Sequence, residues 1–127
     1  MQELAIDALL RYWDCRAESL SVVGVKDGRQ CFRVESNLGS LFAKVQEAPD
    51  GVDEDILLGL RIQSFLTENG IRTSEILKGK NGLGYAEAGG YCITVEKWAD
   101  PEDLRLGTST WEELGSLCGR LHSLFVP

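Results

Sequence analysis

The stretch SLSVVGVKDGRQCFRVESNLGSLFAKVQ, residues 19–46, decides the fold of this chain. Three runs within it, residues 20–25, 30–35 and 40–46, are rich in valine, phenylalanine and leucine, as β-strands are. The breaks at 26–28 and 36–39 consist mostly of residues that form turns. The stretch therefore predicts an antiparallel meander of three strands.

Segments with helical spacing lie on both sides of the meander. Residues 2–13 place apolar side chains on one face, which predicts a leading helix that ends near Asp14. The acidic connection after residue 46 suits a helix N-terminus, and a second helix is expected to run to about Asn69, with Gly70 as its stop. Gly59 lies inside this helix at a cost of about 1 kcal/mol relative to alanine. Residues 109–124 predict a last amphipathic helix.

Two further strands are expected between the second and the last helix. The segments SEILKG (74–79) and GYCITVEKW (90–98) are interpreted as the arms of a hairpin around Lys80, Asn81 and Gly82, with residues 83–85 paired as well. Because strands dominate and neighbouring strands form hairpins, the order predicts an α+β domain. We expect an antiparallel five-stranded sheet with a helix packed on it, plus N-terminal and C-terminal helices.

The composition disfavours several kinds of partner and site. A net charge of −7 argues against nucleic acid or an anionic membrane surface as a partner. The N-terminus lacks the basic region of a signal peptide, and no apolar run reaches the roughly 20 residues of a membrane span. Four scattered cysteines without a CxxC pair, and His122 as the single histidine, predict reduced thiols in a cytoplasmic protein rather than a zinc site. We expect a structural role for His122.

Five segments resemble, in order and spacing, the N-terminal lobe of the aminoglycoside phosphotransferase and choline kinase-like family, relatives of the protein kinases. They are KDGRQCFRV, GSLFAKV, FLTENGIRTSEIL, NGLGYAEAGGYCITVEKWADP and ELGSLCGRLHSL. The resemblance covers essentially the whole chain. It implies that residues 1–127 form one kinase-like N-lobe: a leading helix over 1–17, the sheet and its helix over 18–98, and a hinge linker with a closing helix over 99–127.

The resemblance also implies a site for ATP. In the family a strand lysine holds the α- and β-phosphates, and Lys44 matches it. Strand alternation puts Phe42 on the same face, where the family often stacks an aromatic ring on adenine. The turn at Gly28 is expected to lie over the phosphates. The adenine edge is expected to be read by the backbone of the hinge, made of Val95, Glu96, Lys97 and Trp98.

Plainer interpretations of these residues stay open. Phe42 can be a core side chain beside a Lys44 that extends to the surface, and Gly28 can belong to an ordinary hairpin turn. Trp98 can simply pack against the core.

The acid that orients the lysine is where the match to the family departs. The family's helix glutamate would fall near Gly59, so Glu54, or its neighbour Asp55, is the nearest candidate partner for Lys44. Acids at that position can also merely complement the helix dipole.

The family's catalytic aspartate and its Mg²⁺ ligands lie in a C-terminal lobe, and this sequence shows no match for them. We therefore expect an ATP-binding lobe of a small-molecule phosphotransferase, inactive alone, with no catalytic or metal-binding residue of its own. Completed by a C-lobe and Mg²⁺, it would transfer the γ-phosphate to a hydroxyl, for example of an aminoglycoside or an amino alcohol. We also expect self-association through the last helix or the sheet face. The alternatives are a non-catalytic kinase-like interaction or dimerisation module, and an unrelated α+β domain that binds a metabolite or a protein.

Overall fold

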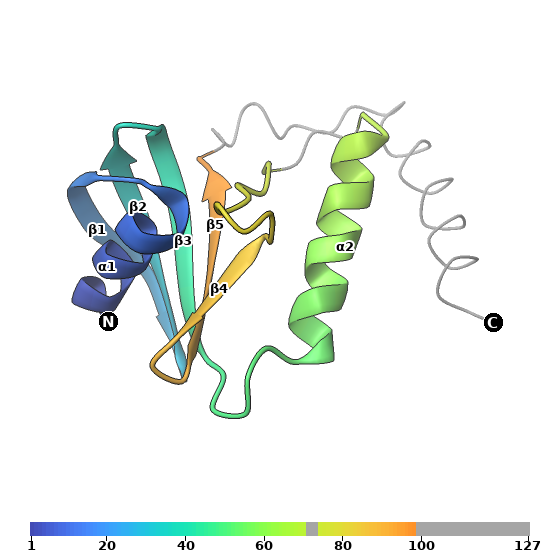
Figure 1. Cartoon of the computed structure of the whole chain (residues 1–127), viewed down its shortest axis with the longest axis horizontal. Coiled ribbons are helices and arrows are strands. Elements are labelled where there is room, and N and C mark those ends of the chain that lie inside the picture. Colours follow the sequence, from blue (N-terminus) through green and yellow to red (C-terminus); the bar gives the residue numbers. More distant parts are fainter. Residues whose placement is uncertain (71–73, 99–127) are drawn as a thin grey trace.

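The computed structural model describes residues 1–70 and 74–98, which form one five-stranded sheet with two helices (Figure 1). The elements in chain order are α1 (Gln2–Trp13), β1 (Ala17–Lys26), β2 (Arg29–Ser36), β3 (Gly39–Glu47), α2 (Glu54–Glu68), β4 (Tyr85–Ala88) and β5 (Tyr91–Lys97). All strand pairs are antiparallel, and the strand order is β1-β2-β3-β5-β4. The predicted α+β class and five-stranded antiparallel sheet are confirmed. The linker and closing helix expected over 99–127, with His122, lie outside the described residues.

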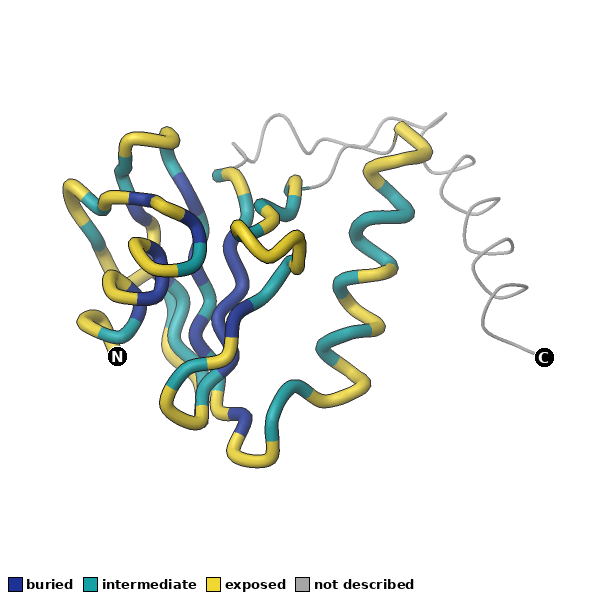
Figure 2. The backbone as a smooth tube through the Cα atoms, in the orientation of Figure 1, coloured by how far each residue is buried: buried dark blue, intermediate teal, exposed yellow. Residues whose placement is uncertain are grey.

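The alternation of side chains in β3 gives the sheet two different faces. Leu41, Ala43 and Val45 are completely buried on one face, whereas Phe42, Lys44 and Gln46 are half-buried on the other. Figure 2 shows the buried segments gathered in the central strands and in the part of α1 that faces them. We call the two sides the α1 face and the α2 face, after the helix that lies beside each.

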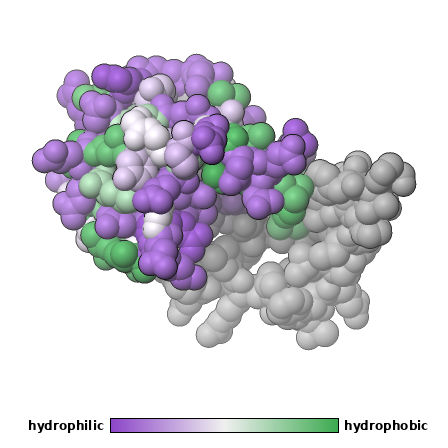
Figure 3. All heavy atoms as spheres, turned by 90° about the horizontal axis from the view of Figure 1, so that it is seen from below, coloured by the Kyte–Doolittle hydropathy of each residue, from purple (hydrophilic) through white to green (hydrophobic). Residues whose placement is uncertain are grey.

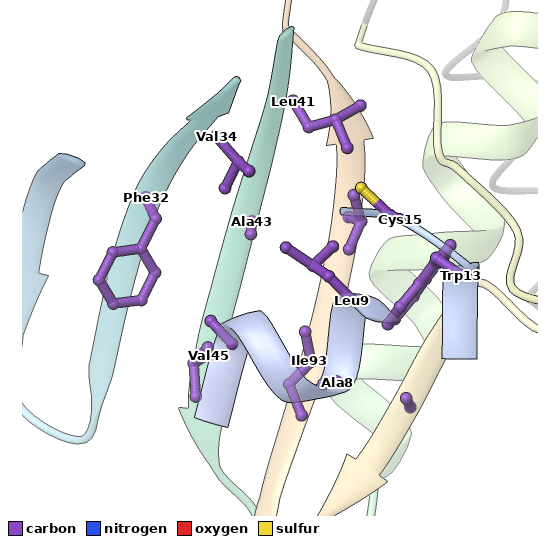
Figure 4. Close-up of a cluster of buried hydrophobic side chains, with 13 residues drawn as sticks. Ala8, Leu9, Trp13, Cys15, Phe32, Val34, Leu41, Ala43, Val45 and Ile93 are labelled. Atoms are coloured by element: carbon purple, nitrogen blue, oxygen red, sulfur yellow. The ribbon is translucent and has the colours of Figure 1, made fainter. Parts of the chain in front are cut away.

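Helix α1 covers the α1 face and completes the core. Its side chains Ala5, Ala8, Leu9 and Trp13 are buried, and Figure 4 shows Leu9 in front of the central strands, with Trp13 beside it. Full burial of a leucine of this kind stabilises the fold by about 2 kcal/mol. The indole Nε1 of Trp13 donates a hydrogen bond of 2.8 Å to the carbonyl of Leu77. The helix ends at Asp14, where the sequence predicted its end, and this residue adopts a left-handed conformation with φ of 52°.

Helix α2 is capped at both ends but is packed loosely. The side chain of Asp53 accepts a hydrogen bond of 2.9 Å from the N–H of Ile56, and the helix ends before Asn69 and Gly70, where φ is +76°. None of its 15 residues, all within the described part, is fully buried. The helix that buries its apolar side on the sheet is therefore α1, and α2 flanks the other face across a hollow.

The prediction of a hairpin that turns at residues 80–82 is wrong. Strand β4 is Tyr85–Ala88, and its hairpin with β5 turns at Gly89 and Gly90, with φ of 58° and 81°. Two successive glycines adopt the positive φ angles of a type I′ turn without a steric penalty, and this turn matches the twist of the strands. Of the predicted strand 74–79, only Ile76 forms a bridge, to Glu96 of β5. The turn at 80–82 exists, but it closes a loop that leaves the sheet edge and returns to it.

Candidate functional site

Lys44 lies in the middle strand of the sheet, on the α2 face. Its backbone pairs with Cys31 of β2 on one side and with Thr94 of β5 on the other. The neighbouring row on the same face consists of Arg33, Phe42 and Glu96. The strand alternation expected from the sequence thus holds, and it presents Phe42 and Lys44 side by side toward α2.

A hollow of about 390 Å³ separates this face from α2, and we call it the Lys44 hollow. This volume is within the range of small-ligand sites. The sheet and the helix contribute mostly polar side chains to its walls: Lys44, Gln46, Asp53, Asp55, Ile56, Gly59, Leu60, Gln63, Thr94 and Glu96.

The helix wall of the Lys44 hollow is set by residues four apart. Asp55, Gly59 and Gln63 lie on one side of α2, as this spacing requires, and all three line the hollow. Glu54, which the sequence favoured as the partner of Lys44, instead lines a separate surface hollow with Leu58 and Arg61. The structure therefore does not bring Glu54 and Lys44 together.

No carboxylate pairs with Lys44 in the described part of the chain. The ion pairs found there are Arg33–Glu35 at 2.9 Å and Lys97–Glu75 at 3.1 Å. The helix position nearest to the family's glutamate, Gly59, does face the Lys44 hollow, but it has no side chain to offer. A Cβ atom added there would meet no other atom within 4 Å.

Phe42 is partly covered by a second aromatic ring. The rings of Phe42 and Trp98 have centroids 6.2 Å apart and are tilted by 46°. The guanidinium carbon of Arg33 lies 4.5 Å from the centre of the Trp98 ring, a cation–π contact. These contacts support the plainer interpretation of Trp98 as a packing residue, and a ligand ring stacked on Phe42 would have to share it with Trp98.

The expected hinge residues belong mainly to the sheet. Val95 is completely buried on the α1 face, and its carbonyl accepts a hydrogen bond of 2.8 Å from Leu77. The N–H of Lys97 donates to Glu75 at 2.8 Å, and the N–H of Trp98 donates to Ser40 at 3.0 Å. These three groups are thus already engaged and are not free to read an adenine edge in this structure.

Gly28 lies beside the Lys44 hollow rather than in it. Its φ of +70° closes the turn between β1 and β2, and its carbonyl accepts a hydrogen bond of 2.7 Å from the N–H of Glu47. The turn borders a separate open hollow, and Gln46 lines both hollows. A Cβ at position 28 would lie 3.0 Å from a carboxylate oxygen of Glu47, so an acidic side chain already lies against this turn.

The pKa of the Cys92 thiol depends on its burial and on charged side chains near the Lys44 hollow. Burial, together with the negative charges of Glu87 and Asp53, raises the pKa of its thiol to about 11, and the positive charge of Lys44 partly opposes this shift. The thiol therefore stays protonated and unreactive at neutral pH.

Within the described residues, no group of three histidine, cysteine, aspartate or glutamate side chains could hold a metal ion, and no helix is long and apolar enough to cross a membrane.

Thr94, a buried residue of the sheet wall that carries a hydroxyl, was not identified from the sequence. Its importance depends on which strand lies beside β3, and a local pattern does not specify that pairing. Only the register between β3 and β5 places Thr94 next to Lys44.

The sequence matches no protein-family model and no curated protein. Among solved structures, the chain is similar to spectinomycin phosphotransferase APH(9)-Ia, whose crystal structure is a complex with ADP and spectinomycin. The TM-score is 0.70 at 17% sequence identity, and the match covers 99% of this chain and 38% of the length of that chain. This likeness confirms the kinase-like fold that the sequence resemblance predicted. At this identity it shows the fold alone.

Proposed function

We propose that this chain is the nucleotide-binding lobe of a small-molecule phosphotransferase and that Lys44 holds the phosphates of ATP or ADP. The observation that carries the proposal is the position of Lys44, half-buried in a hollow of about 390 Å³. The fold is shared with a phosphotransferase whose structure contains ADP. An ammonium group without an ion-pair partner among the described residues is available to an anionic ligand.

The charge of the hollow favours a nucleotide that arrives with Mg²⁺. Lys44 is its only basic residue among the described ones, whereas Asp53, Asp55 and Glu96 are acidic. Three carboxylates repel a bare triphosphate, and a bound Mg²⁺ reduces that repulsion. Since the described residues contain no metal-binding cluster, the ion's ligands would come from the phosphates and from a catalytic lobe.

Phosphoryl transfer depends mainly on positioning and charge neutralisation. The described residues around Lys44 can hold the phosphate chain, but they include no evident group to orient an acceptor hydroxyl. We therefore propose that a C-terminal lobe supplies the catalytic aspartate, the Mg²⁺ ligands and the site for a small hydroxyl acceptor such as an aminoglycoside or an amino alcohol. We place the protein in the cytoplasm, where ATP is available and where the thiols Cys15, Cys31 and Cys92 remain reduced.

Titration of MgADP and MgATP into the chain, followed by calorimetry and by backbone amide shifts, tests the proposal. The wild type is expected to bind, with shifts centred on Lys44 and its strand partners Cys31 and Thr94. The variant Lys44→Met is expected to weaken binding about tenfold, because it removes a charge-assisted hydrogen bond. The control Lys80→Met removes an exposed lysine that does not line the Lys44 hollow and should bind like the wild type. Equal affinity of Lys44→Met and wild type would refute the assignment.

A second candidate is a kinase-like interaction module without nucleotide. It is favoured by the glycine at position 59 and by the engaged backbone groups of Val95, Lys97 and Trp98. It predicts no binding of either nucleotide at millimolar concentration, so the same titration separates the two candidates.

We also propose self-association, and one exposed strand of the described sheet supports it. Polar side chains dominate the face shown in Figure 3, with hydrophobic ones in small groups. The edge strand β1 exposes Val22, Val23 and Val25 by 45%, 48% and 65%. An exposed apolar edge strand can pair with a second chain. Sedimentation of the wild type and of Val25→Lys at increasing concentration measures this, and a monomer at all concentrations would contradict it.

A further inference from the structure

Thr94 is an unusual member of the Lys44 hollow because its side chain is both buried and without a partner. It is only 6% exposed, and it is the single polar residue among the buried ones of the described chain. Of the side-chain hydrogen bonds formed by the described residues, none involves its hydroxyl. A hydroxyl in a nearly buried residue with no partner in the protein is available to bond with whatever occupies the space beside it.

The hydroxyl oxygen of Thr94 reaches the surface of the hollow. Among the described residues, every side-chain oxygen or nitrogen that is fully shielded from solvent has a hydrogen-bond partner. The Thr94 oxygen has no such partner, so it must retain some accessible surface, and the residue lines the Lys44 hollow. The small exposed part of Thr94 therefore borders the hollow, where a ligand could bond with the hydroxyl.

Lys44 and Thr94 form a pair of donors for one anion. The two residues are directly opposite each other on neighbouring strands, which places their Cβ atoms about 5 Å apart on the same face. The lysine ammonium and the threonine hydroxyl can thus both reach an oxyanion in the hollow. Their backbones are fixed by the central strands of the sheet, so the pair is held in place before a ligand arrives.

We propose that Thr94 is a phosphate-binding residue, and that its hydroxyl donates a hydrogen bond to a phosphate oxygen of the nucleotide whose phosphates Lys44 holds. The inference rests on the proposed function and adds a residue to it. The neighbouring carboxylates of Asp53, Asp55 and Glu96 only accept hydrogen bonds when ionised, so they leave this donor role to Thr94, Lys44 and the glutamine amides of the hollow.

The test compares Thr94→Val, which removes the hydroxyl and keeps the shape, with Thr94→Ser, which keeps the hydroxyl. Thr67→Val serves as a matched control because it removes the same group from an exposed position of α2. Each full chain is titrated with MgADP and, separately, with pyrophosphate, and its thermal unfolding is measured without ligand. We expect Thr94→Val to bind both probes about tenfold more weakly, as loss of one hydrogen bond to a charged group predicts. Thr94→Ser and Thr67→Val should stay within about twofold of the wild type on the same scale.

The unfolding midpoint separates a ligand contact from a packing role. Removing a hydroxyl that has no hydrogen-bond partner within the protein should leave the midpoint of Thr94→Val equal to or above that of the wild type. A lower midpoint, with an affinity loss shared by Thr94→Ser, would mark a packing role and overturn the inference. A loss for MgADP without a loss for pyrophosphate would place the contact on the nucleoside and overturn the phosphate assignment.

The same measurements distinguish failure of the inference from failure of the proposed function. If the wild type binds MgADP and Thr94→Val binds it equally well, the role of Thr94 is refuted and the nucleotide site stands. If the wild type binds neither probe, both are refuted.

Discussion

Replacing Gly59 by alanine should stabilise helix α2 locally while leaving the sheet unchanged. Gly59 lies in the interior of the helix, and an added Cβ would meet no atom within 4 Å, so no steric cost offsets the gain in helix propensity. That gain is about 1 kcal/mol in a helix interior. Because α2 buries no residue fully, we expect it to open without global unfolding of the sheet. The gain should therefore appear as about fivefold slower amide hydrogen exchange within α2.

Native-state hydrogen exchange followed by NMR is the assay, because it resolves each helix and strand separately. The amides of the second half of α2 report the effect, and those of β3 and β5 serve as the internal control. An unchanged exchange rate in α2 would refute the reasoning that Gly59 lowers the local stability of this helix. An equal slowing in β3 and β5 would show instead that α2 opens only when the whole domain unfolds. The variant also adds a methyl group at the wall of the Lys44 hollow, so its nucleotide affinity shows how closely a ligand approaches α2.

Three further outcomes follow from the described contacts. Trp13→Phe should lower the free energy of unfolding by about 1–2 kcal/mol, because it leaves the carbonyl of Leu77 without its hydrogen-bond donor. A urea titration measures this, and an unchanged free energy of unfolding would contradict the importance of that bond. Gly90→Ala should cost about 1 kcal/mol by thermal unfolding, since φ is +81° and no neighbouring atom obstructs a Cβ, whereas a neutral result would argue against the type I′ turn. Folding raises the pKa of the Cys92 thiol from 9.0 to about 11, so between these two pH values the thiol is deprotonated in the unfolded chain but still protonated in the folded one. The free energy of unfolding should therefore fall as the pH rises from 9 to 11, and this contribution should be absent from Cys92→Ala.

The elements set by local chemistry were predictable from the sequence. Helix α1, the three-strand meander and the end of α2 at Gly70 all follow from side-chain spacing and from turn residues, and the structure confirms them. The fourth strand was misplaced because two turn signals compete between residues 79 and 91. The Asn-Gly turn at 81–82 is a strong local signal, but the Gly-Gly turn at 89–90 forms the hairpin with β5, and the loop that precedes it packs against the end of α1. The choice between them depends on tertiary contacts that a local pattern does not contain.

The candidate site was predictable only where a single strand defines it. Alternation placed Phe42 and Lys44 on one face, and the structure shows the same arrangement. The partner across the hollow was not predictable, because a shift of one residue along a helix turns a side chain by about 100°. Asp55 lines the Lys44 hollow as well as the neighbouring surface hollow, whereas Glu54 lines only the latter, and this difference depends on how α2 is rotated about its axis.

The two walls of the Lys44 hollow differ in how firmly they are held. The sheet wall is formed by central strands, and Lys44 and Thr94 pair there directly. The helix wall has no fully buried residue; within it Gln63 donates a hydrogen bond to the carbonyl of Ser74, and Val52, just before the helix, donates one to Glu87. Groups on the sheet wall are therefore oriented before a ligand binds, while groups on α2 must be ordered at a cost. It follows that substitutions of Lys44 and Thr94 should affect ligand affinity more than substitutions of Asp55 or Gln63, which lie in the same hollow.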